Sequence, residues 1–183
     1  MFRILALLAM LALAPPALAS EIGDDGLHKP DWLRETFRDL REDLEEANAE
    51  GKRLLILWEQ RGCIYCSQMH AEIYPDPEID SLIRDSFFVL QMNLFGDVEV
   101  TDFDGTALPE KDMARRWGVV FTPTMMFMPE VVEDGKTAQQ AAVVSMPGAF
   151  GKGTTAALLT WVRDKEYENG EHFQKYLANR LSQ

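Results

Sequence analysis

The chain has 183 residues, enough for one domain with a sizeable hydrophobic core, and it contains no internal repeat or low-complexity tract. It carries 30 acidic and 18 basic residues, giving a formal net charge of −12, with no basic stripe. This balance excludes recognition of nucleic acid or anionic lipid by charge, so we expect protein partners or none.

Residues 1–19 have the pattern of a secretory signal peptide. A single charge at Arg3 precedes an apolar run that ends at Ala14, and small residues favour cleavage after Ala19. The run is far shorter than the ~20 residues needed to cross a bilayer, and no later stretch is long enough. We therefore expect an exported protein that does not itself span the membrane.

Apolar residues next recur at helical spacing between Pro30 and Gly51, which predicts an amphipathic helix within an N-terminal extension over residues 20–51. Its apolar face is formed by Leu33, Phe37, Leu40, Leu44 and Ala47. The continuous apolar run 53–58 then predicts a strand buried on both faces, the first of a domain over residues 52–165.

A helix is predicted from Tyr65 to Tyr74, where Pro75 interrupts it, and a second helical piece covers residues 77–84. The apolar run 87–94 predicts a strand. Strand, helix and strand in this order form a right-handed parallel crossover unit.

Residues 96–108 form a predicted acidic loop, and a short helix runs from Pro109 to Gly118. Strands over residues 124–128 and 141–145 are joined by the turn-rich residues 133–135, which favours antiparallel pairing. Helices are predicted over residues 154–168, capped by Thr154 or Thr155, and over residues 171–181 within a C-terminal tail, residues 166–183.

This order of elements predicts an α/β fold, a mixed four-stranded sheet with helices on both faces. Reactive groups of such folds lie where the carboxyl end of a strand meets the next helix. Cys63 and Cys66 follow the first strand at this position.

The chain has only these two cysteines. A bond between them closes a loop of a few residues, which stabilises a fold very little, so a purely structural disulfide is a weak explanation. At a helix N-terminus the Cys63 thiolate is favoured by free N–H groups and by the helix dipole. We therefore predict that Cys63 exchanges with a partner disulfide and that Cys66 resolves the mixed disulfide.

Other chemistries fit the same residues less well. Covalent haem attachment requires histidine where Ser67 stands, and zinc lacks a fourth ligand, because His28 and His172 lie near opposite ends of the chain. A Cu(I) site on the two cysteines with Met69 or His70 is the alternative from another class. We predict no metal. A peptide-binding module with incidental cysteines is a third hypothesis.

The strand, the Cys-Ile-Tyr-Cys helix start, Thr122-Pro123 and the turn at residues 146–149 together resemble the thioredoxin superfamily. Residues 100–105, the following helix and the Thr-Pro-Thr strand are more closely similar to its periplasmic SoxW-type branch. The resemblance covers residues 52–162. It implies a thioredoxin fold with a cis peptide before Pro123, and a partner groove formed by Thr122, Pro123, Gly148 and Ala149.

The chain departs from thioredoxins near the cysteines. Leu57 stands where thioredoxins carry a buried acidic residue, and Glu59 could replace that residue, although strand alternation favours an exposed or ion-paired Glu59. Gly62 replaces a tryptophan, and Tyr65 resembles the motif of periplasmic disulfide isomerases. Glu59, Tyr65 and His70 are therefore candidates for tuning the thiols.

The resulting hypothesis is a periplasmic thiol:disulfide oxidoreductase, chiefly a reductase of disulfide-bearing exported proteins. The sequence has no flavin or nicotinamide motif, and we predict no cofactor. The resemblance implies a membrane thiol transporter as electron donor. A disulfide oxidase or isomerase and a copper-binding chaperone are the alternatives.

Overall fold

The computed structural model describes residues 20–182. The predicted signal peptide, residues 1–19, lies outside the described residues. Within the described part of the chain, no helix has the length and apolar character needed to cross a membrane.

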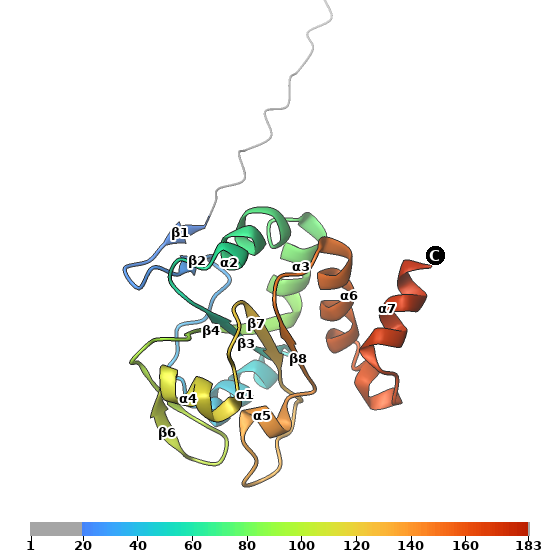
Figure 1. The fold of residues 1–183 in the computed structure, drawn as a ribbon. Helices are drawn as coiled ribbons and strands as arrows, with labels where there is room; N and C mark the ends of the chain where they lie inside the picture. Colours follow the sequence, from blue (N-terminus) through green and yellow to red (C-terminus); the bar gives the residue numbers. More distant parts are fainter. Residues whose placement is uncertain (1–19, 183) are drawn as a thin grey trace, which may run out of the picture.

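A four-stranded sheet in the order β4-β3-β7-β8 forms the centre of the fold (Figure 1). β3 (Arg53–Glu59) is parallel to β4 (Phe87–Asn93) and antiparallel to β7 (Thr124–Phe127), which pairs antiparallel with β8 (Val144–Pro147). The predicted mixed sheet and the parallel crossover are confirmed.

Alternate residues of β3 face two separate cores. Leu54, Ile56 and Trp58 pack against α1 (Leu40–Ala49) and α4 (Glu110–Trp117). Leu55 and Leu57 pack on the other face, against α3 (Pro77–Ser86) and α6 (Lys152–Arg163). Because helices cover both faces, β3 is buried from Leu54 to Glu59, as its unbroken apolar sequence predicted.

The predicted helix from Pro30 to Glu50 is wrong in its first half. Arg38 has a left-handed φ of 58°, and Asp39 caps α1 by accepting hydrogen bonds from the N–H groups of Arg41 and Glu42. Residues 34–38 lie outside any helix or strand, and Leu33 forms a β-bridge with Val89. Phe37 is therefore 97% exposed instead of lying on an apolar helix face.

Two short hairpins were not predicted. β1 (Glu21–Ile22) pairs with β2 (His28–Lys29) in the N-terminal extension. β5 (Glu99–Thr101) pairs with β6 (Ala107–Pro109) inside the expected acidic loop. Both consist of very short strands, too short for alternation to appear in the sequence.

The connection between β7 and β8 contains α5 (Ala138–Ala141), so β8 begins three residues later than predicted. α4 ends at Gly118, whose φ of 68° gives the expected left-handed helix stop.

The predicted helix over residues 154–168 is two elements, α6 and the 3-10 turn η2 (Glu166–Asn169), because Lys165 has a φ of 56°. Gly151 is the N-cap of α6, so the prediction of a Thr154 or Thr155 cap is wrong. α7 (Phe173–Leu181) packs on α6 through an edge-to-face contact between Phe173 and Trp161.

Candidate active site at the Cys63–Cys66 pair

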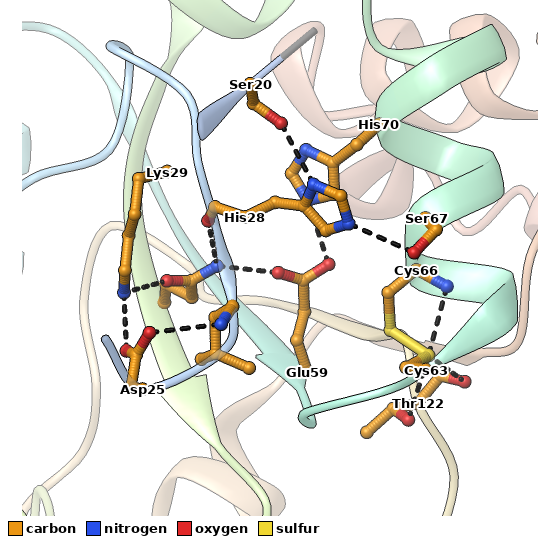
Figure 2. Close-up of polar contacts among 12 residues, drawn as sticks. Ser20, Asp25, His28, Lys29, Glu59, Cys63, Cys66, Ser67, His70 and Thr122 are labelled. Carbon is orange, nitrogen blue, oxygen red and sulfur yellow. Dashed lines mark hydrogen bonds and ion pairs between the residues drawn. A yellow bond between two sulfur atoms is a disulfide. The ribbon is translucent and has the colours of Figure 1, made fainter. Parts of the chain in front are cut away.

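The two cysteines lie at the N-terminus of α2 (Ile64–Gln68), directly after β3 and a turn in which Gly62 has a φ of 71°. Cys63 is the N-cap residue of this helix, and its sulfur accepts a hydrogen bond of 3.0 Å from the N–H of Cys66 (Figure 2). Free N–H groups at a helix N-terminus stabilise negative charge on a sulfur in this position. The local geometry therefore favours a Cys63 thiolate once the pair is reduced.

Cys63 and Cys66 form a disulfide, with their Cα atoms 5.2 Å apart. Cys63 is 7% exposed and Cys66 only 2%. Cys63, the residue at the helix cap, is thus slightly more accessible than Cys66. The two intervening residues, Ile64 and Tyr65, are exposed, so Tyr65 lies on the outer surface of the motif, where a partner would contact it.

The loop before β7 lies against Cys63. The Thr122–Pro123 peptide bond is cis, as the resemblance implied. The Thr122 hydroxyl donates to the sulfur of Cys63 at 3.3 Å, and the Thr122 carbonyl oxygen lies 3.5 Å from the same sulfur. Gly148 donates its N–H to the Pro123 carbonyl at 2.7 Å, and Ala149 follows it in the chain. The structure therefore brings Thr122 and Pro123 to the cysteines and Gly148 to Pro123.

Glu59 is buried, so the expectation of an exposed side chain is wrong. It is only 1% exposed and accepts hydrogen bonds from His70 Nε2 at 2.9 Å and from Gln91 Nε2 at 2.6 Å (Figure 2). Strand alternation could not expose it, because β3 is covered on both faces and Glu59 shares the face of Leu57. The alternative of ion pairing fits this geometry when His70 is protonated.

His70 reaches Glu59 from η1 (Met69–Ile73), a π-helical turn that continues α2. π-helical turns within helices occur frequently at functional sites. Met69 is fully buried in the core between α3 and α6, away from the surface of the motif. Within residues 20–182, no three His, Cys, Asp or Glu side chains are arranged to hold a metal ion.

His28 and Gln91 also belong to this site, and the sequence did not indicate them. The His28 ring stacks on the His70 ring with centroids 4.4 Å apart, and its Nε2 is hydrogen-bonded to Ser67 Oγ at 3.1 Å. Burial, and then the nearby His70, lowers the pKa of His28. The sequence offered one signal for these contacts. Gln91 is a polar residue inside an apolar strand, and a buried amide needs hydrogen-bond partners.

Comparison with known proteins identifies the family of this chain. Residues 40–149 match the family model described as a thioredoxin-like domain. The chain belongs to the thioredoxin-like domain family. The match runs from α1 to the end of the Pro147–Ala149 turn, and it leaves the β1–β2 hairpin outside.

Solved structures agree on the fold. A thioredoxin-fold protein from Helicobacter pylori has a TM-score of 0.58 and 16% identity, covering 72% of this chain and 86% of its own. A thioredoxin from Thermus thermophilus has a TM-score of 0.53 and 25% identity, covering 73% of this chain and 90% of its own. No curated protein matches the sequence significantly. The thioredoxin fold predicted from the resemblance is confirmed.

Proposed function

We propose that this thioredoxin-like protein is a thiol:disulfide oxidoreductase that uses Cys63 as the exchanging residue and Cys66 as the resolving residue. The observation that carries the proposal is the environment of the Cys63 sulfur. It caps a helix and accepts the Cys66 N–H and the Thr122 hydroxyl, and the Cys63 residue is 7% exposed against 2% for Cys66.

In the reducing direction the pair begins as dithiol. The Cys63 thiolate attacks one sulfur of a client disulfide, the client S–S bond breaks, and the other client sulfur leaves as a thiolate that takes up a proton. Cys66 then loses its proton and attacks the Cys63 sulfur, which forms the Cys63–Cys66 bond and releases the second client thiolate. Two electrons pass from the pair to the client. The disulfide of this structure is the product state.

We further propose that the protein works in the periplasm, after cleavage behind Ala19, as a member of the SoxW-type branch. The signal-peptide pattern of residues 1–19 supports export. Disulfide-bearing exported proteins would be its clients, and a membrane thiol transporter would return the pair to the dithiol state. The mass of the exported protein tests the first step, because cleavage leaves Ser20 as the first residue.

The reduction potential of the Cys63–Cys66 couple tests the direction of electron flow. Equilibration with glutathione should place it near that of thioredoxin, about −270 mV, and the reduced protein should then reduce insulin. A potential near about −120 mV would identify an oxidant and overturn the reductase assignment. Stoichiometric Cu(I) binding without insulin reduction would replace the proposal with a copper chaperone.

A further inference from the structure

The N-terminal hairpin, defined as residues 20–29, lies beside the helix that carries the cysteines (Figure 1). Its two strands pair antiparallel, with Ile22 opposite His28. This hairpin lies outside residues 40–149, the segment that matches the family model.

The hairpin is attached on both sides of the cysteine motif. Arg61, two residues before Cys63, donates from Nη2 to the Asp24 carbonyl at 2.7 Å and from Nε to the Asp25 carbonyl at 3.3 Å. Ser67, which follows Cys66, is hydrogen-bonded to His28. Both attachments use residues adjacent to the motif, so the hairpin is held in register with the reacting sulfurs.

A second set of contacts holds the hairpin to the interior. The amide of Gln91 donates to the His28 carbonyl at 2.7 Å and accepts from Lys29 Nζ at 2.7 Å, while the same amide binds Glu59 (Figure 2). Lys29 also pairs with Asp25 at 2.7 Å. These buried and half-buried bonds order the hairpin in the free protein, which lowers the entropic cost of using it to bind a partner.

A cleft of about 450 Å³ lies between the hairpin and the start of the motif. Its walls include Ile22, Gly23 and Asp24 from the hairpin, and Gln60, Gly62 and Cys63 from the motif. Ile22 is 57% exposed, so it is accessible to a partner. Thr122 and Pro123 do not line this cleft, so the hairpin provides Cys63 with a wall separate from the Pro123 loop.

We propose that the N-terminal hairpin is a client-recognition element whose residues Ile22–Asp24 hold the polypeptide segment next to the client disulfide. This inference rests on the proposed function. The occupant is an extended protein segment that places an apolar side chain on Ile22 and polar groups against Asp24 and Gln60. A small disulfide has no polypeptide segment to lie along Ile22–Asp24, so under this proposal recognition by the hairpin separates protein clients from small ones.

The test compares two substrates in the double variant Ile22→Ala, Asp24→Ala of the full chain. Both residues line the cleft, and the Asp24 carbonyl that binds Arg61 is retained in the variant. We expect the KM for insulin to rise about fivefold or more, a modest loss of binding, with kcat nearly unchanged. The rate with neutral hydroxyethyl disulfide should stay within about twofold of wild type.

Val131→Ala is the matched control. Val131 is also an exposed aliphatic residue. It follows β7, which runs antiparallel to β3, and its neighbour Glu130 pairs with Arg53 at the start of β3. Val131 therefore lies toward the end of the sheet opposite to the cysteines, which follow the end of β3. This variant should resemble wild type with both substrates.

Two results overturn the hairpin proposal while the oxidoreductase function stands. One is an unchanged KM for insulin in the double variant. The other is an equal loss with insulin and hydroxyethyl disulfide, which would show that the hairpin acts on the cysteines through structure alone. A wild-type protein that reduces neither substrate overturns the proposed function itself, and the hairpin proposal falls with it.

Discussion

Two carboxylates of this protein are buried to almost the same extent but have different partners. Asp102 is 0% exposed and Glu59 is 1% exposed. Asp102 accepts hydrogen bonds of 2.8 Å from the backbone N–H groups of Phe103 and Ala138 and from the Trp117 indole, and it lies 3.1 Å from Arg116. Among residues 20–182, Glu59 is bound by two side chains, the imidazole of His70 and the amide of Gln91.

The difference lies in what the partners can do. None of the four donors to Asp102 changes its protonation between pH 5 and 8, so this carboxylate is a fixed junction that ties the loop after β5 to α4 and α5. Glu59 is bound by His70, which lies on the helical turn that continues from the cysteines, so this carboxylate is linked to the helix of the candidate site. The contacts of Asp102 therefore stabilise the fold, whereas we propose that those of Glu59 affect the ionisation of the cysteine thiols.

Removing the Asp102 carboxylate should have the largest effect on stability. In Asp102→Ala the N–H groups of Ala138 and Trp117 lose their acceptor in the interior, and Arg116 loses one of its two carboxylates. We expect a loss of about 3–5 kcal/mol in the free energy of unfolding. Urea denaturation measures it. A loss below about 1 kcal/mol would show that Asp102 is not the junction described.

Glu59→Gln should cost less stability, about 1–2 kcal/mol, because the amide keeps the shape and part of the hydrogen bonding. Its main effect should be on chemistry. Removal of a negative charge near α2 favours a thiolate there, so the pH profile of disulfide exchange should move about 0.5 unit toward lower pH.

The matched control for this shift is Asp102→Asn. It removes an equally buried carboxylate whose partners include Trp117 of α4 and Ala138 of α5, not the helix that carries the cysteines. Its pH profile should coincide with that of wild type. A Glu59→Gln profile that does not move, or moves upward, would remove Glu59 from the tuning residues.

Asp43 is a third buried carboxylate, and its replacement should have a smaller effect on the free energy of unfolding. Burial raises the pKa of Asp43 to about 6, and within the described residues its Oδ2 has no hydrogen-bond partner. Because the pKa is higher in the folded state than in the unfolded state, Asp43 costs stability as pH rises from about 4 to about 6. Asp43→Asn should therefore stabilise the protein by about 1 kcal/mol at pH 7 and by nothing below pH 4. Equal stabilisation at both pH values would contradict this origin.

The sequence predicted the parts of the fold that depend on local pattern. β3 and β4 are unbroken apolar runs, and α4 is bounded by Pro109 and Gly118, so their type and approximate ends could be read directly. The segment before α1 could not be predicted in this way, because its apolar residues have helical spacing. Its actual course depends on the left-handed conformation of Arg38 and on the β-bridge between Leu33 and Val89 of β4.

The site divides in the same way. Cys63, Cys66 and Pro123 were found from motif and resemblance. His28 was missed because it lies 42 residues before His70 in the chain, and nothing local indicates that the two rings stack. The burial of Glu59 was not predicted, because alternation predicts the face of a residue but not what covers that face, whereas its pairing with His70 fits the ion-paired alternative.

Trapping of a mixed disulfide tests the central claim most directly, because it asks which sulfur meets the client. Each single-cysteine variant, Cys66→Ala and Cys63→Ala, would be incubated with a disulfide-bearing protein and analysed by non-reducing electrophoresis and mass spectrometry. Cys66→Ala should accumulate a covalent adduct through Cys63, while Cys63→Ala should form almost none, since Cys66 lies inside α2 and is only 2% exposed, whereas Cys63 is the N-cap residue. Equal adducts from both variants, or none from either, would contradict the division of roles between the two cysteines.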